Sequence, residues 1–282
     1  MSLIIKLDDN LSVELDSVSA YIASYLSWAR KARVYTTLWP LISYRGHACE
    51  KWPLLPSLCR QKLPVEMLEE YEHEVINEFR NKFELSEWTD IEVLAYARHH
   101  GAPTRLLDWS MNPFVGLWFA VSEKECDSSS GSVFQLSLLS LRDMPEVISF
   151  TPSFLKLPMK EEIAYKQPVW VFSSPTRVSR TLRQRSVFSL ASFHEGYVLK
   201  PLDQIAKSDK PLPIRKFPVP AKFKPELRRL LSDVGLDAYS IYGDPDSLGK
   251  ALATHFDISD LNVPSELPRE DAHLGESPNK KV

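Results

Sequence analysis

The chain has 282 residues and a formal net charge of −3, and 44% of its residues are hydrophobic. This length and apolar content are sufficient to bury a large core in one domain or in two smaller ones. The near-neutral charge excludes a global basic field that would recruit nucleic acid or an anionic membrane, and leaves room only for a local basic patch.

Cellular location is predicted from three absences in the sequence. No run of about 18 apolar residues could cross a bilayer, and the N-terminus MSLIIKLDDN meets acidic residues too early for a signal peptide. The three cysteines, Cys49, Cys59 and Cys126, are odd in number and lack metal-ligand spacing. We therefore expect a reduced cytoplasmic protein with no membrane partner.

The N-terminal third predicts a strand, a helix and a second strand. Leu3, Ile5 and Leu7 alternate with polar residues, and residues 17–32 carry apolar side chains at helical spacing. An apolar run over residues 38–46 ends in Arg45 and Gly46. Such an arginine can hold an anion while glycine lets a ligand approach the backbone, or it can simply cap a helix or pair with a glutamate.

Two amphipathic helices are expected next, over residues 65–82 and 90–100. We interpret the glutamates of the first helix as its solvated face. His99 and His100 lie in the last turn of the second helix, where cations are favourable without any function. Adjacent histidines point apart, so no metal site is predicted here.

The stretch His99 to Ala120, HHGAPTRLLDWSMNPFVGLWFA, is the densest in candidate site residues. Leu106 to Trp109 predicts a short strand, and Ser110 with Asn112 predicts the cap of a following helix. Arg105 and Asp108 flank this strand between buried elements, so each must be paired or functional. A structural Arg–Asp ion pair and a ligand site both stay open, and Trp109 is expected to be exposed.

The C-terminal half is predicted to alternate strands and helices after an irregular segment at residues 141–168. Strands are expected at residues 133–139, 169–172, 187–193, 197–199, 214–220 and 238–242, and helices at residues 175–186, 225–234 and 245–256. The helix from Pro175 is the most basic segment, and its Arg177, Arg180 and Gln184 share one face that could hold phosphates or be solvated. We predict one domain over residues 1–257, in which residues 1–37 lead into the main body, and a disordered polar tail at residues 258–282.

Three sequence blocks together resemble the FRG domain family. The first is Tyr44-Arg45-Gly46, followed by Trp52, Leu55, Pro56 and Arg60. The second is the run of residues 99–120, and the third is the Leu-x-x-x-Gly pattern with a following aromatic and Asp, in residues 231–248. The chain departs from the family at Arg98, where glutamine is usual, and at Gly243, where proline is usual.

A weaker resemblance connects the chain to ADP-ribosyltransferases. A strand that ends in Tyr-Arg-Gly opens the NAD site in many of these enzymes, and Asp108-Trp109-Ser110 before an aromatic helix is similar to their second motif. The resemblance implies an α+β fold, with a mixed or antiparallel split sheet flanked by helices. Ser186 stands where the DNA-modifying members carry the catalytic glutamate, and Glu195 is the nearby carboxylate that could replace it.

The resemblance implies NAD as the substrate and no metal. Cleavage of the ribose–nicotinamide bond builds positive charge on the sugar, which a carboxylate must stabilise, here Asp108 or Glu195. The remaining assignments are NAD contacts from Tyr44, Arg45, Gly46, Thr104, Arg105, Trp109 and Ser110, and acceptor contacts from Arg180, Arg183, Gln184, His99 and His100.

The predicted function is an ADP-ribosyltransferase-like toxin or defence effector that modifies nucleic acid or protein and is restrained by a partner antitoxin. A non-catalytic nucleotide-sensing module and a protein-interaction domain are the alternatives. In the last of these, all the charges named above would be structural ion pairs.

Overall fold

The computed structural model describes residues 3–8, 11–15, 17–31, 42–137, 148–151, 168–173, 183–207, 210–211 and 214–255. Its centre is a seven-stranded sheet in the order β11-β5-β3-β4-β8-β7-β6. Only β6 and β7 are parallel, and the other neighbours run antiparallel. The strands are β3 (Ile42–His47), β4 (Leu106–Ser110), β5 (Gly131–Ser137), β6 (Ile148–Thr151), β7 (Val169–Ser173), β8 (Ser186–Ala191) and β11 (Ile214–Val219).

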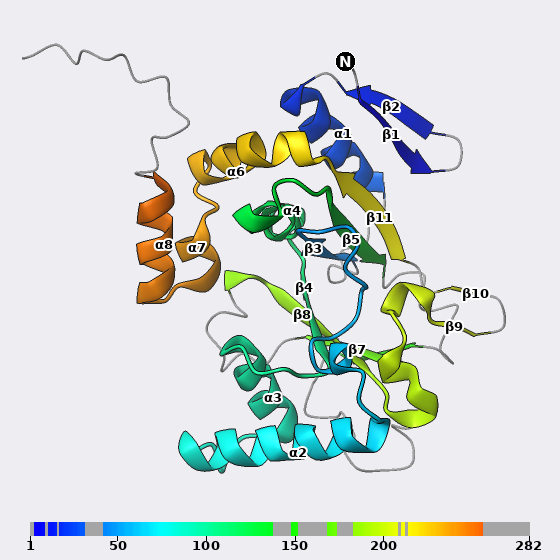
Figure 1. Ribbon diagram of the computed structural model, residues 1–282, viewed down its shortest axis with the longest axis vertical. Helices are drawn as coiled ribbons and strands as arrows, with labels where there is room; N and C mark the ends of the chain where they lie inside the picture. The colour runs from blue at the N-terminus through cyan, green and yellow to red at the C-terminus, as the bar shows by residue number, and fades with distance from the viewer. Residues whose placement is uncertain are drawn as a thin grey trace, which may run out of the picture.

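Helices lie at both ends of this sheet and against its faces, so the expected α+β class with flanking helices is confirmed (Figure 1). The helix α1 and the hairpin β1-β2 lie at one end, and α2 with α3 lies at the other. The α-helices are α1 (Val18–Lys31), α2 (Val65–Lys82), α3 (Asp90–His99), α4 (Pro113–Val121), α6 (Lys224–Asp233), α7 (Ala238–Tyr242) and α8 (Pro245–His255).

Shorter elements complete the described part of the chain. The two small hairpins are β1 (Leu3–Asp8) with β2 (Leu11–Leu15) and β9 (Ala206–Lys207) with β10 (Lys210–Pro211). The 3-10 helices are η1 (Leu58–Gln61), η2 (Lys124–Cys126), η6 (His194–Leu199), η7 (Leu202–Gln204) and η8 (Ala221–Phe223). No helix in these described ranges is both long enough and apolar enough to cross a membrane.

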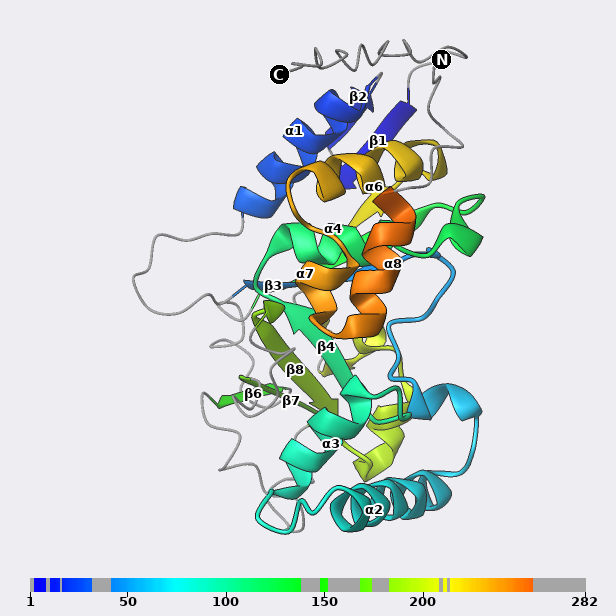
Figure 2. The same cartoon turned by 90° about the vertical axis from the view of Figure 1, so that its left-hand side faces the viewer.

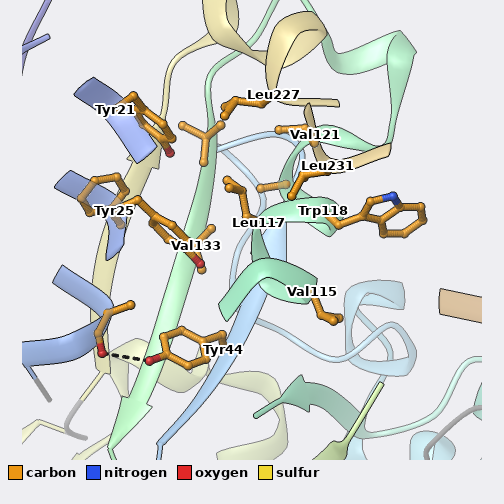
Figure 3. Packing of buried hydrophobic residues seen from close by; sticks show 14 of the residues in the cluster. Tyr21, Tyr25, Tyr44, Val115, Leu117, Trp118, Val121, Val133, Leu227 and Leu231 are labelled. Atoms are coloured by element: carbon orange, nitrogen blue, oxygen red, sulfur yellow. Dashed lines mark hydrogen bonds between the residues drawn. The ribbon is translucent and has the colours of Figure 1, made fainter. Parts of the chain in front are cut away.

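The largest core cluster surrounds α4, which packs across β3 and β5. Figure 3 shows the side chains of α1, β3 and α6 converging on this helix. Contact is close because two glycines face each other here: a Cβ built on Gly46 would lie 2.1 Å from the carbonyl oxygen of Gly116. Gly46 therefore allows the close approach of α4 to β3. The expected contact between its backbone and a ligand stays a prediction.

The sheet nearly divides between β3 and β4. These strands share a single residue pair, Tyr44 with Ser110, whereas β3 and β5 are paired along the whole of Ile42–His47. In Figure 2 β3 and β4 cross the view in different directions. Regular backbone pairing is thus nearly absent at this junction, and the side chain of Arg45 reaches across it to the backbone carbonyl of Asp108.

Most predicted elements agree with the structure, but several short ones differ. Residues 238–242 form the helix α7, not a strand, because Asp237 and Ser240 make reciprocal capping hydrogen bonds. Residues 197–199 belong to the 3-10 helix η6, and the strands β2 and β6 were not predicted. Residues 174–182, with most of the predicted basic helix, and the tail at 258–282 lie outside the described residues.

Candidate functional site

Asp108 is held by two arginines at the junction of β3 and β4. The carboxylate oxygen Oδ2 accepts a hydrogen bond from Nε of Arg98 at 3.0 Å and lies 3.0 Å from its Nη2. Nη1 of Arg45 lies 3.7 Å from the same oxygen and donates to the backbone carbonyl of Asp108 at 2.8 Å. The three side chains are 12% to 31% exposed, so solvent screens the cluster only in part.

Each arginine is fixed by further contacts. Arg98, on the last turn of α3, also donates to the hydroxyl of Ser57 at 3.2 Å. Arg45 donates from Nε to the imidazole of His47 at 3.2 Å. Burial lowers the pKa of Arg45 to about 10, and the neighbouring Arg98 lowers it while Asp108 raises it. Arg45 is therefore a cation at neutral pH, and the cluster carries one net positive charge.

A pocket of about 260 Å³ opens beside this cluster. Its lining combines polar and charged side chains, among them Arg98, His99 and Asp108, with the aromatic rings of Phe119, Phe188 and Tyr242. The complete lining is Ala95, Arg98, His99, Gly101, Asp108, Phe119, Gln184, Ser186, Phe188 and Tyr242. Of the elements that contribute these residues, α3 lies below and α7 above in Figure 2, with β4 and β8 between them.

Arg105, predicted as a partner of the same ligand, lies elsewhere. Its Nε donates to Glu72 at 2.7 Å, its Nη1 donates to the carbonyl of Ala191, and its guanidinium lies 4.3 Å from the ring centre of Phe193. The side chains of Arg105 and Glu72 are 11% and 4% exposed. The ion pair left open by the sequence exists, but between Arg105 and Glu72 and not between Arg105 and Asp108.

Of five other predicted NAD contacts, Gly46 is partly exposed and packs against α4, and the remaining four are buried. The hydroxyl of Tyr44 donates to the carbonyl of Ala29 at 3.0 Å, inside the core (Figure 3). Trp109 is 1% exposed, which corrects the expectation of an exposed ring, and its indole donates to Ser189. The described pocket lining includes none of the five, namely Tyr44, Gly46, Thr104, Trp109 and Ser110.

Some of the residues predicted to contact the acceptor line the pocket, and others do not. Gln184 lines it and donates to the carbonyl of Ile241 at 3.3 Å, whereas exposed Arg183 lies over the ring of Tyr239. His99 lines the pocket, and the ring of His100 lies tilted against the ring of Tyr96, with 4.5 Å between centroids. Arg180 lies outside the described residues. Glu195 belongs to η6, at the far end of β8 from Ser186, and its side chain is not among those described.

Sequence reasoning missed three residues of this region. Arg98 was set aside as a departure from the family, yet it contributes two nitrogen atoms to Asp108. Tyr242 joins the pocket from α7, and no local pattern predicts that contact. Glu72 was placed on a solvated face, but it lies four residues from both Leu68 and Ile76, on the buried stripe of α2. That spacing could have identified it.

His47 predicts a measurable pH dependence of stability. Burial, together with the neighbouring charge of Arg45, lowers its pKa from the ordinary 6.5 to about 3. Below about pH 6.5 His47 is protonated in the unfolded chain but stays neutral in the folded chain. The folded state is therefore most stable, relative to the unfolded state, above that pH, and it loses stability as the pH falls toward the folded-state pKa. We expect the protonation of His47 in the unfolded chain to lower the free energy of unfolding by about 2 kcal/mol when the pH falls from 7 to 5.

Urea unfolding at pH 7 and pH 5 measures this effect, with His47→Gln as the comparison because glutamine does not titrate. The variant should lose about 2 kcal/mol less than the wild type over the same interval. Equal losses in the two proteins would show that His47 is protonated at an ordinary pKa.

Comparison with known proteins places the charged cluster, but not the whole pocket lining, within a recognised domain. The FRG domain model matches residues 41–129, which is 89 of the 282 residues. No curated protein and no solved structure matches the chain. The matched range holds Arg45, Arg98 and Asp108, whereas Gln184 and Tyr242 reach the pocket from beyond it. The chain therefore contains an FRG domain.

Proposed function

We propose that this pocket binds NAD and that the chain is an ADP-ribosyltransferase-like enzyme. The observation that carries the proposal is the convergence of Arg45, Arg98 and Asp108 where β3 and β4 part, beside a pocket with an aromatic wall. A carboxylate at a cationic, partly buried site is the arrangement that cleavage of a nucleotide N-glycosidic bond requires.

The charge and the walls of the pocket support a nucleotide ligand. Two guanidinium groups face one carboxylate, so the site attracts an anion such as a pyrophosphate. Phe119, Phe188 and Tyr242 offer apolar surface to a planar ring, and Gln184 offers an amide. Pockets that enclose a whole ligand typically have volumes of about 300–1,000 Å³. The volume of about 260 Å³ is smaller, so we place only the nicotinamide–ribose end of NAD in this pocket and the rest of the dinucleotide outside.

The proposed reaction assigns one role to Asp108. The bond between ribose C1′ and the nicotinamide nitrogen breaks, and nicotinamide leaves with the electron pair. An acceptor oxygen or nitrogen then bonds to C1′ and loses its proton to solvent. Asp108 stabilises the positive charge that develops on the ribose, while Arg98 holds the carboxylate in place.

The proposal also covers the acceptor of the ADP-ribose group and the role of the enzyme in the cell. The acceptor is a nucleic acid or a protein that enters past Arg183 and Gln184, since exposed Arg183 adjoins the pocket-lining amide. Such an enzyme acts as a toxin or defence effector and needs a partner antitoxin or regulatory protein. Expression in cells should then arrest growth, and Asp108→Asn should relieve the arrest.

A second candidate is a nucleotide-sensing module without catalysis. One observation favours it: the charge of Asp108 is already compensated by Arg98 and Arg45, which weakens its ability to stabilise a cationic ribose. Among the described residues that line the pocket, Asp108 is also the one carboxylate.

Nicotinamide release and label transfer from NAD, measured with total RNA, DNA or lysate, test the proposal. We expect Asp108→Asn to lower release by about a thousandfold, since it removes the charge that stabilises the transition state. Arg45→Ala should abolish release, and Arg80→Ala, which removes the ion pair between α2 and α3, should leave it unchanged. Full turnover in Asp108→Asn would contradict the proposed mechanism.

Thermal unfolding with NAD and ADP separates the alternatives. Stabilisation by a nucleotide without nicotinamide release, lost in Arg98→Ala, would support the sensing module. If no nucleotide stabilises the wild type and none is cleaved, the charges are structural and the protein-interaction domain is favoured.

A further inference from the structure

His47 follows the Tyr44-Arg45-Gly46 signature and faces the same side of β3 as Arg45. Its side chain is almost completely enclosed, with the residue 2% exposed. The imidazole contacts the ring of Phe134 edge-on, with 5.0 Å between centroids, and the ring of Trp52 at 6.3 Å. A histidine packed in this way keeps one orientation.

The hydrogen bonds of His47 define a single tautomer. Nδ1 lies 3.3 Å from the carbonyl oxygen of Trp52, which can only accept, so Nδ1 must carry the proton. Nε2 lies 3.2 Å from Nε of Arg45, which can only donate, so Nε2 must be the unprotonated acceptor. A proton on Nε2 would place two donors against each other and displace Arg45.

The guanidinium of Arg45 is consequently held at two points. Nε is fixed by His47, and Nη1 is fixed by the carbonyl oxygen of Asp108 at 2.8 Å. Two anchored nitrogen atoms define the plane of the group and its position beside the Asp108 carboxylate. Since β3 and β4 share only one residue pair, regular strand pairing does not supply this alignment.

We infer that His47 is a positioning residue: as the neutral Nδ1–H tautomer, it donates to the carbonyl of Trp52, accepts from Arg45 and so orients Arg45 beside the pocket-lining residue Asp108. The charged groups that face His47 are the cations Arg45, Arg60 and Lys216, which favour the same neutral form. The assignment of a tautomer stands without any ligand, whereas the effect on affinity rests on the proposed nucleotide site.

The first test is nitrogen-15 NMR of the full-length chain, which needs no ligand. We expect one histidine ring with protonated Nδ1 and unprotonated Nε2, unchanged between pH 7 and pH 5 and absent from His47→Gln. The Arg45 Nε–H should exchange slowly with water in the wild type and in His47→Gln, because the amide also offers an acceptor. It should exchange rapidly in His47→Leu. A cationic His47, or an Nε2–H tautomer, would overturn the inference.

The second test measures the dissociation constants of NAD and ADP for the same proteins. His47→Leu should weaken binding about tenfold by freeing Arg45, His47→Gln should restore it to within about threefold, and His73→Leu on the exposed face of α2 is the control. Wild-type affinity in folded His47→Leu would refute the positioning role. Absence of binding to the wild type refutes the nucleotide proposal, and the NMR result then decides the inference alone.

Discussion

Replacing Gly46 with alanine is expected to destabilise the fold by about 3 kcal/mol or more. The new Cβ would lie 2.1 Å from the carbonyl oxygen of Gly116, 2.5 Å from the backbone nitrogen of Ala120 and 2.8 Å from Cβ of Phe119. Two of these atoms belong to the backbone of α4, so no side-chain rotation relieves the clash. The helix must move away from β3, which also displaces Phe119 from the pocket wall.

Urea unfolding followed by circular dichroism measures this loss. The matched control is Gly249→Ala, because a Cβ on Gly249 in α8 meets nothing within 4 Å. That change should be neutral or stabilising by about 1 kcal/mol, since alanine favours a helix over glycine. A stable Gly46→Ala protein with an unshifted midpoint would show that α4 does not press on β3.

Replacing Glu72 with alanine is expected to cost about 3–5 kcal/mol, because it leaves the Arg105 cation buried without its partner. Arg105 and Glu72 are among the least exposed charged side chains of the molecule, and 2.7 Å separates Nε from Oε1. Burial raises the pKa of Glu72, and the adjacent Arg105 lowers it. The pair joins α2 to the end of β8, since Arg105 also donates to Ala191.

A double-mutant cycle with Arg105→Ala isolates this interaction. The double variant should lose much less stability than the sum of the single variants, because no charge is then stranded. Asp90→Ala breaks the more exposed Arg80–Asp90 pair and should cost about 1 kcal/mol or less. Additive losses in the cycle would mean that the two groups do not interact in solution.

Local side-chain spacing determined the long elements of this protein. The apolar stripe of α2, with Leu68, Val75 and Ile76, predicts a helix over residues 65–82, as observed. Asn112 caps α4 by accepting from the backbone of Phe114, as the cap signal predicts. The secondary structure of short segments was harder to predict. The apolar run at residues 238–242 is compatible with a strand or a helix, and the capping box of Asp237 favours the helix that is observed.

The residue types of the site were also visible in the sequence, but their partners were not. Alternation along a strand would have excluded an ion pair between Arg105 and Asp108, since residues three apart face opposite sides. It could not have supplied Arg98, which meets Asp108 only because α3 packs beside β4. Whether Tyr44 and Trp109 line a pocket or a core was equally undetermined.

The sequence by itself thus determined the main helices and strands, its resemblance to known families indicated the α+β class, and its motifs made Arg45 and Asp108 candidate site residues. Only the tertiary structure decided that β3 and β4 part after one residue pair, that α4 rests on Gly46, and that Gln184 and Tyr242 complete the pocket. The physical reason is the range of the interactions. Periodicity and capping act between residues a few positions apart, whereas the partner of a charge depends on which faces meet when distant elements pack.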